Sequence, residues 1–127
     1  VPTLLGALGM EVPVRVQGKT LLDICTGKAD AHKHRDQVYT EYYIGQPFHR
    51  KLRQRPMLTT VRTRTAKITS YAGMQIGELY DLESDPGEHV NLWDSAKHRD
   101  LKTRMLKRCF DASILTQDPI PVAEADW

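Results

Sequence analysis

The stretch GELYDLESDPGEHVNLW, residues 77–93, decides the fold. Its first half contains ELYDL, which follows two glycines and which we expect to be the returning strand of a hairpin, over residues 78–82. Asp85-Pro86-Gly87 then has the residues of a type II turn, because proline presets φ at the second position and glycine accepts a positive φ at the third. The stretch therefore predicts a strand that ends in a tight turn. The residues that could hold strand, turn and a following helix together are Leu79, Tyr80, Leu82, Leu92 and Trp93.

Three more strand-like segments precede this one. QVYTEYY at residues 37–43 and the segments at 57–63 and 66–71 are rich in β-branched and aromatic residues. The last two are separated by only two residues, which suits a tight hairpin. A second hairpin is expected at residues 72–77, where Gly73 and Gly77 would supply positive φ. The order predicts a four-stranded antiparallel sheet in which each strand pairs with the next.

A long amphipathic helix is expected after the sheet, from a cap at Asp94 or Ser95 to Thr116. Its cationic residues are interpreted as its outer surface, and Asp118-Pro119 would end it. Its apolar face is expected to contain Leu101, Met105 and Cys109, flanked by Leu106, Phe110 and Ser113.

The first part of the chain predicts less regular structure. Residues 1–9 read as a short helix with Leu4, Leu5 and Leu8 on one face, and residues 10–31 as a loop with one helical turn at 21–24. We therefore predict an α+β fold, a four-stranded antiparallel sheet packed against a long C-terminal helix and preceded by a short helix and loop. The expected divisions are residues 1–36, 37–118 and a tail at 119–127. The start at Val1 suggests an excised or processed segment.

Composition excludes some classes of protein. The chain has 127 residues, of which 40% are hydrophobic and 27% charged, as expected for one globular core. No stretch approaches the roughly 20 apolar residues that cross a bilayer, and no signal-peptide pattern is present, so we expect a soluble protein of unknown compartment. Cys25 and Cys109 match neither a disulfide framework nor a zinc spacing, and their redox state stays open.

Charge is unevenly distributed along the chain. Seven Lys or Arg and no acids lie between Glu41 and Glu78, whereas residues 78–94 contain six acids and no Lys or Arg. The simplest interpretation is that these two segments lie together in one fold, with the acids beside Arg62, Arg64 and Lys67.

Three strings in this order resemble the C-terminal part of a sulfatase: VPTLLGALGMEVP with VQGKTLLD (1–23), LTTVRTRTAKITSY (58–71) and GELYDLESDPGEHVNLW (77–93). The resemblance implies a parent enzyme that hydrolyses sulfate esters with a formylglycine, made from Cys or Ser in the pattern Cys/Ser-x-Pro-x-Arg, beside a divalent cation, usually calcium. Neither Cys25 nor Cys109 begins that pattern, and no serine does. The formylglycine and the cation site are expected in an N-terminal catalytic domain. This chain alone is therefore predicted to be inactive, with no catalytic residue and no metal ligand.

The basic loop at residues 44–56, IGQPFHRKLRQRP, carries the candidate site. In several sulfatases the small domain lends a loop to the substrate rim, so we hypothesise that His49 and Arg50 approach a sulfated small molecule or glycan. The alternative is a small basic module that binds nucleic acid or another polyanion through Arg50, Lys51, Arg53 and Arg55, of which nucleic acid is the less expected ligand.

Two further expectations concern metals and association. His32 and His34 are close enough to share a metal ion, but no third ligand accompanies them, so a solvated loop is the favoured interpretation. Leu4, Leu5 and Leu8 would lose their partner surface without the catalytic domain, which predicts self-association of the isolated chain.

Overall fold

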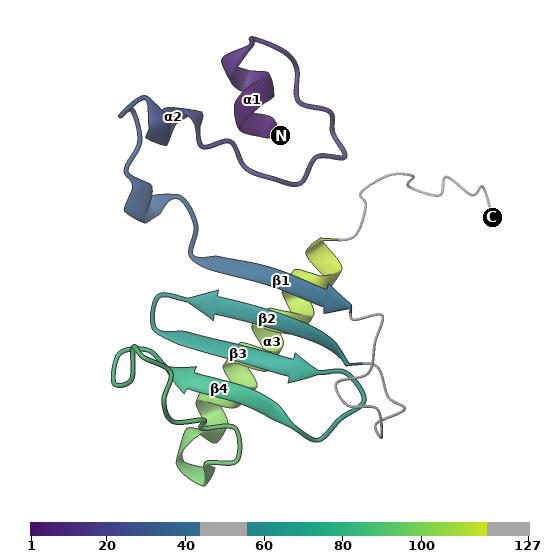
Figure 1. Cartoon of the computed structure of the whole chain (residues 1–127), viewed down its shortest axis with the longest axis vertical. Helices are drawn as coiled ribbons and strands as arrows, with labels where there is room; N and C mark the ends of the chain where they lie inside the picture. The colour runs from purple at the N-terminus through teal and green to yellow at the C-terminus, as the bar shows by residue number, and fades with distance from the viewer. Residues whose placement is uncertain (44–55, 117–127) are drawn as a thin grey trace, which may run out of the picture. The chain divides into compact units, whose positions relative to one another are not determined.

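Four strands form one antiparallel sheet in the order β1-β2-β3-β4, so that each strand pairs with the next along the chain (Figure 1). The computed structural model describes residues 1–43 and 56–116. They fall into two units, residues 36–113 and residues 1–35 with the end of the chain from 114. The strands are β1 (Gln37–Tyr43), β2 (Met57–Thr63), β3 (Ala66–Tyr71) and β4 (Gly77–Asp81).

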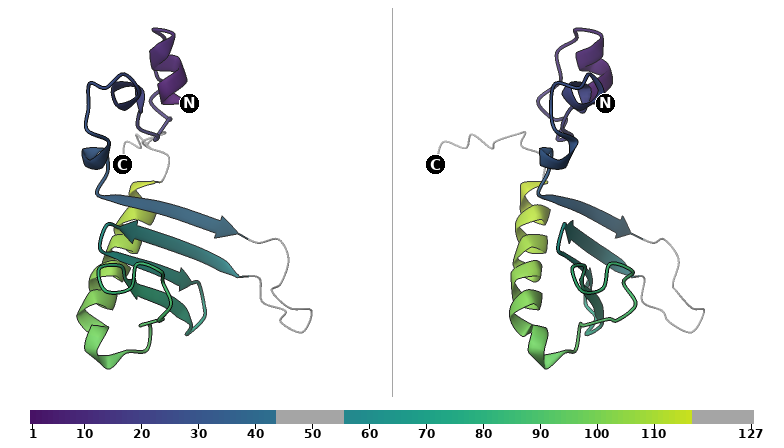
Figure 2. Two further views of the ribbon diagram at one scale, coloured as in Figure 1. Left: turned by 60° about the vertical axis from the view of Figure 1, so that its left-hand side comes forward. Right: turned by 90° about the vertical axis from the view of Figure 1, so that its left-hand side faces the viewer.

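The register places two rows of side chains on opposite faces of the sheet. Tyr39, Val61, Ile68 and Leu79 are paired across the four strands and form the row on one face. Val61, Ile68 and Leu79 are fully buried, because helix α3 (Arg99–Leu115) lies along this face (Figure 2). The other face carries the neighbouring row, which contains Val38, Arg62, Lys67 and Tyr80.

Helix α3 supplies its side of the core from Met105, Cys109 and Ala112, which lie three or four residues apart and are all buried. A short 3₁₀ helix at Ala96–His98 precedes it, with Ser95 as N-cap. Phe110 was expected beside the apolar face of the helix, but its side chain is 62% exposed. The α+β fold, with its four strands and covering helix, is confirmed.

Two predictions about glycine backbone conformation were wrong. Gly73 has a positive φ of 73°, but Gly77 lies within β4 and is not among the described glycines with positive φ. In the turn after β4, the amide of Glu88 donates to the carbonyl of Asp85, and Glu88 instead of Gly87 has a positive φ, 58°. A type II turn requires positive φ at Gly87, so this turn is not of that type.

The other unit contains helices α1 (Pro2–Ala7) and α2 (Leu22–Cys25) and a 3₁₀ helix at Ala31–Lys33. Pro2 is buried and lies 3.4 Å from the position of a Cβ on Gly18, and the hydroxyl of Thr3 accepts a hydrogen bond from the amide of Leu21. Leu4 and Leu8 are 71% and 73% exposed. The predicted division into residues 1–36, 37–118 and 119–127 stays a prediction. Within the described part of the chain, no helix has the length and apolar character needed to cross a membrane.

Candidate functional site

Glu88 joins two cations that face each other across the sheet, and we call this cluster the Glu88 bridge (Arg62, Lys67 and Glu88). Arg62 and Lys67 are directly opposite on β2 and β3, a position in which like charges destabilise a sheet. The carboxylate of Glu88 accepts one hydrogen bond from Arg62 Nη1 and one from Lys67 Nζ. Lys67 foremost, and then Arg62, hold the pKa of Glu88 below its usual range. The predicted pairing of the acidic and basic segments therefore occurs at Glu88.

The outer edge of β4 is covered by the segment that follows it. The side chain of Asn91 accepts hydrogen bonds from the amides of Leu79 and Trp93 and donates one to the carbonyl of Gly77. The amide of Leu92 donates to the carbonyl of Leu79 at 2.8 Å. These bonds satisfy backbone groups that an edge strand would otherwise present to solvent or to another chain.

Trp93 explains why Gly77 is a glycine. Its indole ring lies so close that a Cβ at Gly77 would stand 2.3 Å from Trp93 Cζ3. The indole N–H donates to the carbonyl of Gln75, and Lys102 Nζ lies 3.7 Å from the ring centroid. Trp93 thereby connects β4 to α3.

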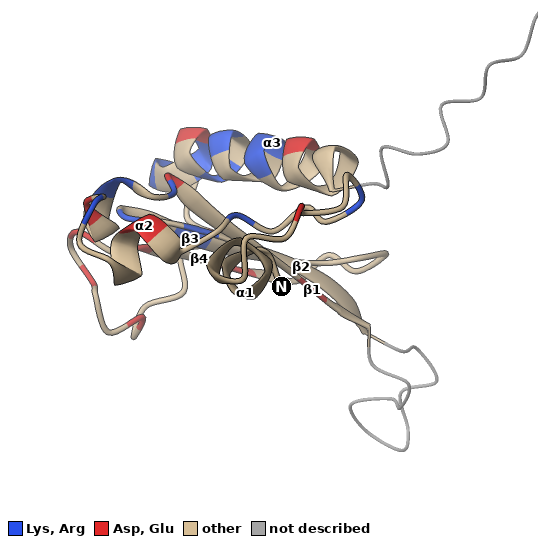
Figure 3. Ribbon diagram, turned by 90° about the horizontal axis from the view of Figure 1, so that it is seen from above, with Lys and Arg blue, Asp and Glu red and all other residues tan. Residues whose placement is uncertain are grey.

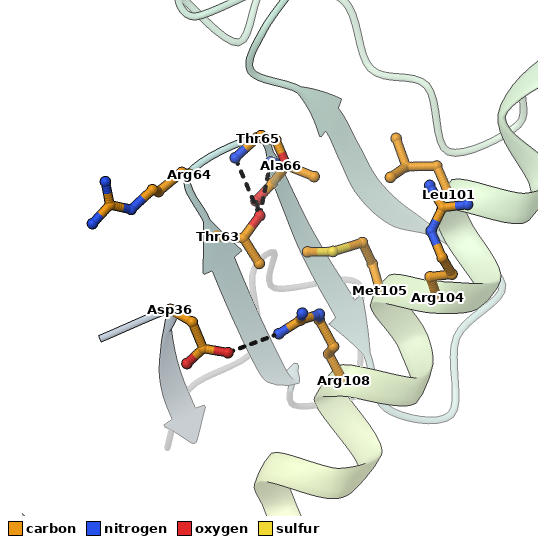
Figure 4. A pocket seen from close by; sticks show the side chains of 9 residues that line it. All are labelled: Asp36, Thr63, Arg64, Thr65, Ala66, Leu101, Arg104, Met105 and Arg108. Carbon is orange, nitrogen blue, oxygen red and sulfur yellow. Dashed lines mark hydrogen bonds and ion pairs between the residues drawn. The ribbon is translucent and has the colours of Figure 1, made fainter. Parts of the chain in front are cut away.

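A groove of about 360 Å³ lies between the β2–β3 turn and α3 (Figure 4). Its floor is apolar and includes Ala66 and Met105, which are buried, and Leu101, which is partly buried. We call it the arginine groove because, among the described residues that line it, three arginines and one acid, Asp36, give a net charge of +2. The polar residues of the lining are Asp36, Thr63, Arg64, Thr65, Arg104 and Arg108.

The three arginines differ in how they are held. Arg108 Nη1 donates to the side-chain oxygen of Gln37 at 2.6 Å and lies 3.4 Å from a carboxylate oxygen of Asp36. No hydrogen bond or ion pair joins the side chain of Arg64 or Arg104 to another described residue. Figure 4 shows Arg64 pointing away from α3, while Arg104 and Arg108 project from successive turns of it. Two of the three guanidinium groups are therefore available to a ligand.

A second hollow of about 330 Å³ adjoins the arginine groove, and its described lining has a net charge of −1, from three acids against Lys97 and Arg104. Thr65, Leu101 and Arg104 line both hollows, so they lie at the boundary between the two. Figure 3, in which Lys and Arg are blue and Asp and Glu red, shows residues of both signs along α3. The acidic residues of the second hollow are Asp81, Glu83 and Asp100.

The described residues do not supply the chemistry of an active site. Burial raises the pKa of the Cys109 thiol, so this cysteine is a buried thiol and not a reactive thiolate at neutral pH. Burial, with a hydrogen bond to Glu41, also raises the pKa of Tyr39 above its usual value. No three His, Cys, Asp or Glu side chains of residues 1–43 and 56–116 are grouped as metal ligands, so these residues do not fit a catalytic cation. His32 is exposed, and the buried His34 Nε2 has no hydrogen-bond partner among the described residues.

The residues singled out from the basic loop, His49 and Arg50, lie outside the described residues, as do Lys51, Arg53 and Arg55. The structure describes the two anchor points of that loop, Tyr43 at the end of β1 and Met57 at the start of β2. The arginine groove was not predicted from the sequence. Arg64 is separated by forty positions from Arg104, and the arginines of α3 were interpreted as a solvated surface, so no local pattern indicated it.

The fold defines an α+β domain in which one sheet is covered by one helix. The profile of the family described as N-sulphoglucosamine sulphohydrolase, C-terminal, matches residues 1–114. The chain belongs to this family, and it is a C-terminal domain of sulfatase-like hydrolases. No curated protein matches the sequence at a significant level.

Solved structures agree with this assignment. A 2-O GAG sulfatase is 26% identical over 92% of this chain, with a TM-score of 0.75. A protein solved with its substrate D-glucosamine-2-N,6-O-disulfate is 22% identical over 98% of the chain (TM-score 0.72), and the phosphonate monoester hydrolase of Silicibacter pomeroyi is 21% identical over 93% (TM-score 0.79). These last two show likeness of fold alone. The chain spans about a quarter of each structure, 24%, 25% and 24%.

Proposed function

We propose that this chain completes the fold of a sulfatase-like hydrolase that cleaves sulfate esters. The match of the family profile to residues 1–114 carries the proposal. The chain corresponds to about a quarter of the matched 2-O GAG sulfatase, which leaves room in a parent protein for a separate catalytic domain. A formylglycine and a divalent cation such as calcium would belong to that domain, since the described residues fit neither.

The activity is tested on the full-length protein with two classes of substrate. Because the fold is also found in a phosphonate monoester hydrolase, a sulfate monoester and a phosphonate monoester of the same alcohol are compared at equal concentration. We expect a higher kcat/KM for the sulfate ester. A higher kcat/KM for the phosphonate ester would contradict the proposal. So would the absence of hydrolysis of both esters, provided that mass spectrometry shows the nucleophile of the protein converted to formylglycine.

Within this function, His49 and Arg50 are proposed to border the substrate cleft. The support is the charge of the segment between β1 and β2, which has four Lys or Arg and no acid within residues 44–56. In the full-length enzyme, the double variant His49→Ala with Arg50→Ala should raise KM for a sulfated substrate and change kcat less. Lys19→Gln with Lys28→Gln is the matched control, because both lysines are exposed and lie in the other unit. Equal KM values for the two double variants would remove the idea.

The catalytic domain is also the proposed partner of the N-terminal unit. Leu4 on α1 and Leu8, the C-cap of this short helix, are 71% and 73% exposed, and both are apolar residues without a described partner surface. We therefore expect the isolated chain of 127 residues to self-associate, and Leu4→Ser with Leu8→Ser to reduce this. Gel filtration with light scattering at increasing concentration measures it, and a monomer throughout the series would count against the proposed partner surface.

A further inference from the structure

The two edges of the sheet differ in how their backbone groups are used. Strands β1 and β4 lie at opposite edges (Figure 1). At the β4 edge, the outward-directed backbone groups of Gly77 and Leu79 are hydrogen-bonded to Asn91 and Leu92. Among the residues that the structure describes, the backbone of β1 is hydrogen-bonded to β2 alone. An edge strand in this condition is a template for a further strand.

The hydrogen-bond pattern shows which residues of β1 direct their backbone groups away from β2. In an antiparallel pair, the backbone groups of successive residues point alternately to the two sides of a strand. The amide of Ala72 donates to the carbonyl of Met57, so Met57 and every second residue after it direct their groups to β3. The residues of β2 between them are directed to β1, and their partners in the register are Val38, Thr40 and Tyr42. The other four residues of β1 are therefore directed outward: Gln37, Tyr39, Glu41 and Tyr43.

Strand β1 has none of the sequence features that keep edge strands from pairing. Such edges are commonly blocked by lysine, proline, a bulge or a covering segment. Residues 37–43 contain no Lys, Arg or Pro, and each of them has one partner in β2 without a bulge. Three of their large side chains are at least half exposed, Val38 at 50%, Tyr42 at 56% and Tyr43 at 63%. The strand thus combines high β-propensity with exposure at the edge.

One antiparallel register pairs β1 with a second copy of itself over its whole length. In this register Thr40 lies on a two-fold axis, opposite Thr40 of the second copy. The outward-directed residues then meet each other as hydrogen-bonded pairs, Gln37 with Tyr43 and Tyr39 with Glu41. A shift by one residue would bring outward-directed residues opposite inward-directed ones. A shift by two would leave only five of the seven residues paired.

The side chains match in the same register. Val38 lies opposite Tyr42, which pairs a β-branched residue with an aromatic one, and the two Thr40 hydroxyl groups can hydrogen-bond to each other. Tyr39 lies opposite Glu41, and its hydroxyl already donates to Glu41 of its own strand at 2.6 Å. The one charged residue of β1 therefore meets a phenol, whereas one of the two-residue shifts would place two Glu41 carboxylates opposite each other.

We propose that two copies of the full-length protein associate through β1, in antiparallel register about Thr40, and join their four-stranded sheets into one of eight strands. The occupant of the edge is a second copy because the sequence of β1 complements itself in backbone direction, side-chain type and charge. The assembly closes at two copies, since the β4 edge of each sheet is already covered. The inference does not depend on the proposed hydrolase activity.

Charge substitution at the two-fold axis tests the register. Thr40 is exposed, so Thr40→Lys and Thr40→Glu should keep the fold of a single copy. Each variant alone places two like charges opposite each other and should weaken the dimer about tenfold. An equimolar mixture of the two variants pairs Lys with Glu and should restore the wild-type dissociation constant. Only a register in which residue 40 meets residue 40 gives this rescue.

Sedimentation equilibrium of the full-length protein over a series of concentrations measures these constants. The full-length protein is used because its catalytic domain is proposed to cover the leucines of the N-terminal unit, which removes their contribution to self-association. Thr103→Lys is the matched control, since Thr103 is an exposed threonine on α3 and not on β1. This control should dimerise as the wild type does.

Removal of one outward-directed amide tests the edge itself. Glu41→Pro deletes the amide that points away from β2 and keeps the hydrogen bonds between β1 and β2, which is where edge strands accept proline. The two-fold axis doubles the loss, so the dimer should weaken about a hundredfold. Glu41→Gln is the control, because it keeps the amide, and it should weaken the dimer less. If Glu41→Pro does not fold, the Thr40 variants decide the question alone.

The outcomes separate a second copy from other occupants of the edge. A wild-type protein that stays monomeric throughout the series overturns the proposal, as does a dimer that is equally stable in Thr40→Lys and Glu41→Pro. A mixture of the two Thr40 variants that dimerises no better than either alone overturns the register. Slow hydrogen exchange of the peptide 37–43 at every concentration, in a monomer, overturns the proposal in favour of another part of the same chain. Because no result depends on turnover, failure here leaves the proposed hydrolase function untouched.

Discussion

The segment 77–93 and the arginine groove deal with polar groups in opposite ways. In the segment, Asn91 pairs three backbone groups and Glu88 bonds two cations, so these two side chains are satisfied from within the domain. In the groove, Arg64 and Arg104 have no described partner. The difference teaches that one region is built to stabilise the fold, whereas the other keeps its charges available. Substitutions in the first should lower stability, and those in the second should not.

The largest effect is expected from Gly77→Ala. A Cβ at this position would stand 2.3 Å from Trp93, and the ring can withdraw only by giving up its contacts with Gln75 and Lys102. We expect a loss of about 3 kcal/mol in the free energy of unfolding, as for overpacked cores. Thermal unfolding of the full-length protein checks it. Gly6→Ala is the control, because its Cβ would lie 3.6 Å from the nearest atom, which is an ordinary contact. A similar loss of stability in Gly6→Ala would show that the contact with Trp93 is not the cause of the effect at Gly77.

Asn91→Ala should have the next largest effect. The substitution removes three hydrogen bonds and leaves the amide of Leu79 without its acceptor, which costs about 2 kcal/mol. Hydrogen exchange of the peptide containing Leu79 should become faster by roughly tenfold or more. Asn91→Asp keeps an acceptor for Leu79 and loses the donor to Gly77, so its exchange rate should lie between the two. Unchanged exchange in Asn91→Ala would show that the edge of β4 does not need this side chain.

Glu88→Gln should lower the free energy of unfolding by about 1 kcal/mol at neutral pH, because the bridge is partly exposed and lies on the surface of the sheet. The pKa of Glu88 is lowered in the folded state, so its contribution is present above the unfolded value near 4.5 and is lost as pH falls through the folded value. The stability difference between wild type and variant should therefore shrink below about pH 4.5. Glu83→Gln serves as the control, since Glu83 is an exposed acid of the same segment. A difference that grows with acidity would contradict the bridge.

The smallest expected effect differs in sign between two cations of α3, of which only Arg104 lines the groove. Arg104→Gln removes one of two like charges at positions i and i+4 and should raise the free energy of unfolding by about 0.3 kcal/mol in buffer without sulfate or phosphate. Lys107→Gln on the same helix breaks the pair with Asp111 and should lower it by a similar amount. Parallel denaturation curves of the two variants measure both. A loss of stability in Arg104→Gln would show that this arginine serves the fold.

Much of the fold was predictable because its signals are local. Strands β1, β2 and β3 have the predicted bounds, since β-branched and aromatic residues alternate between faces and turn residues separate the segments. The helix was predictable from the spacing of Met105 and Cys109, which repeat on one side of a 3.6-residue period. These elements depend on patterns within about ten residues, which a single sequence contains.

The misplaced details depend on contacts between distant residues. Glu88 adopts the positive φ expected of Gly87, and its carboxylate meets Arg62 and Lys67, which precede it by more than twenty residues. Gly77 was expected as a flexible turn residue, yet its small size matters because Trp93 lies against it. The groove assembles Arg64 and Arg104 from a turn and a helix. His49 and Arg50 stay a prediction, because the structure does not describe them.

The covering of β4 by Asn91 and Leu92 has a consequence for assembly. An incoming peptide that extends a sheet by β-augmentation needs a free row of amides and carbonyls, and this row is already occupied at the β4 border. Asn91, together with the amide of Leu92, thus closes the β4 edge of the sheet to the addition of a further strand.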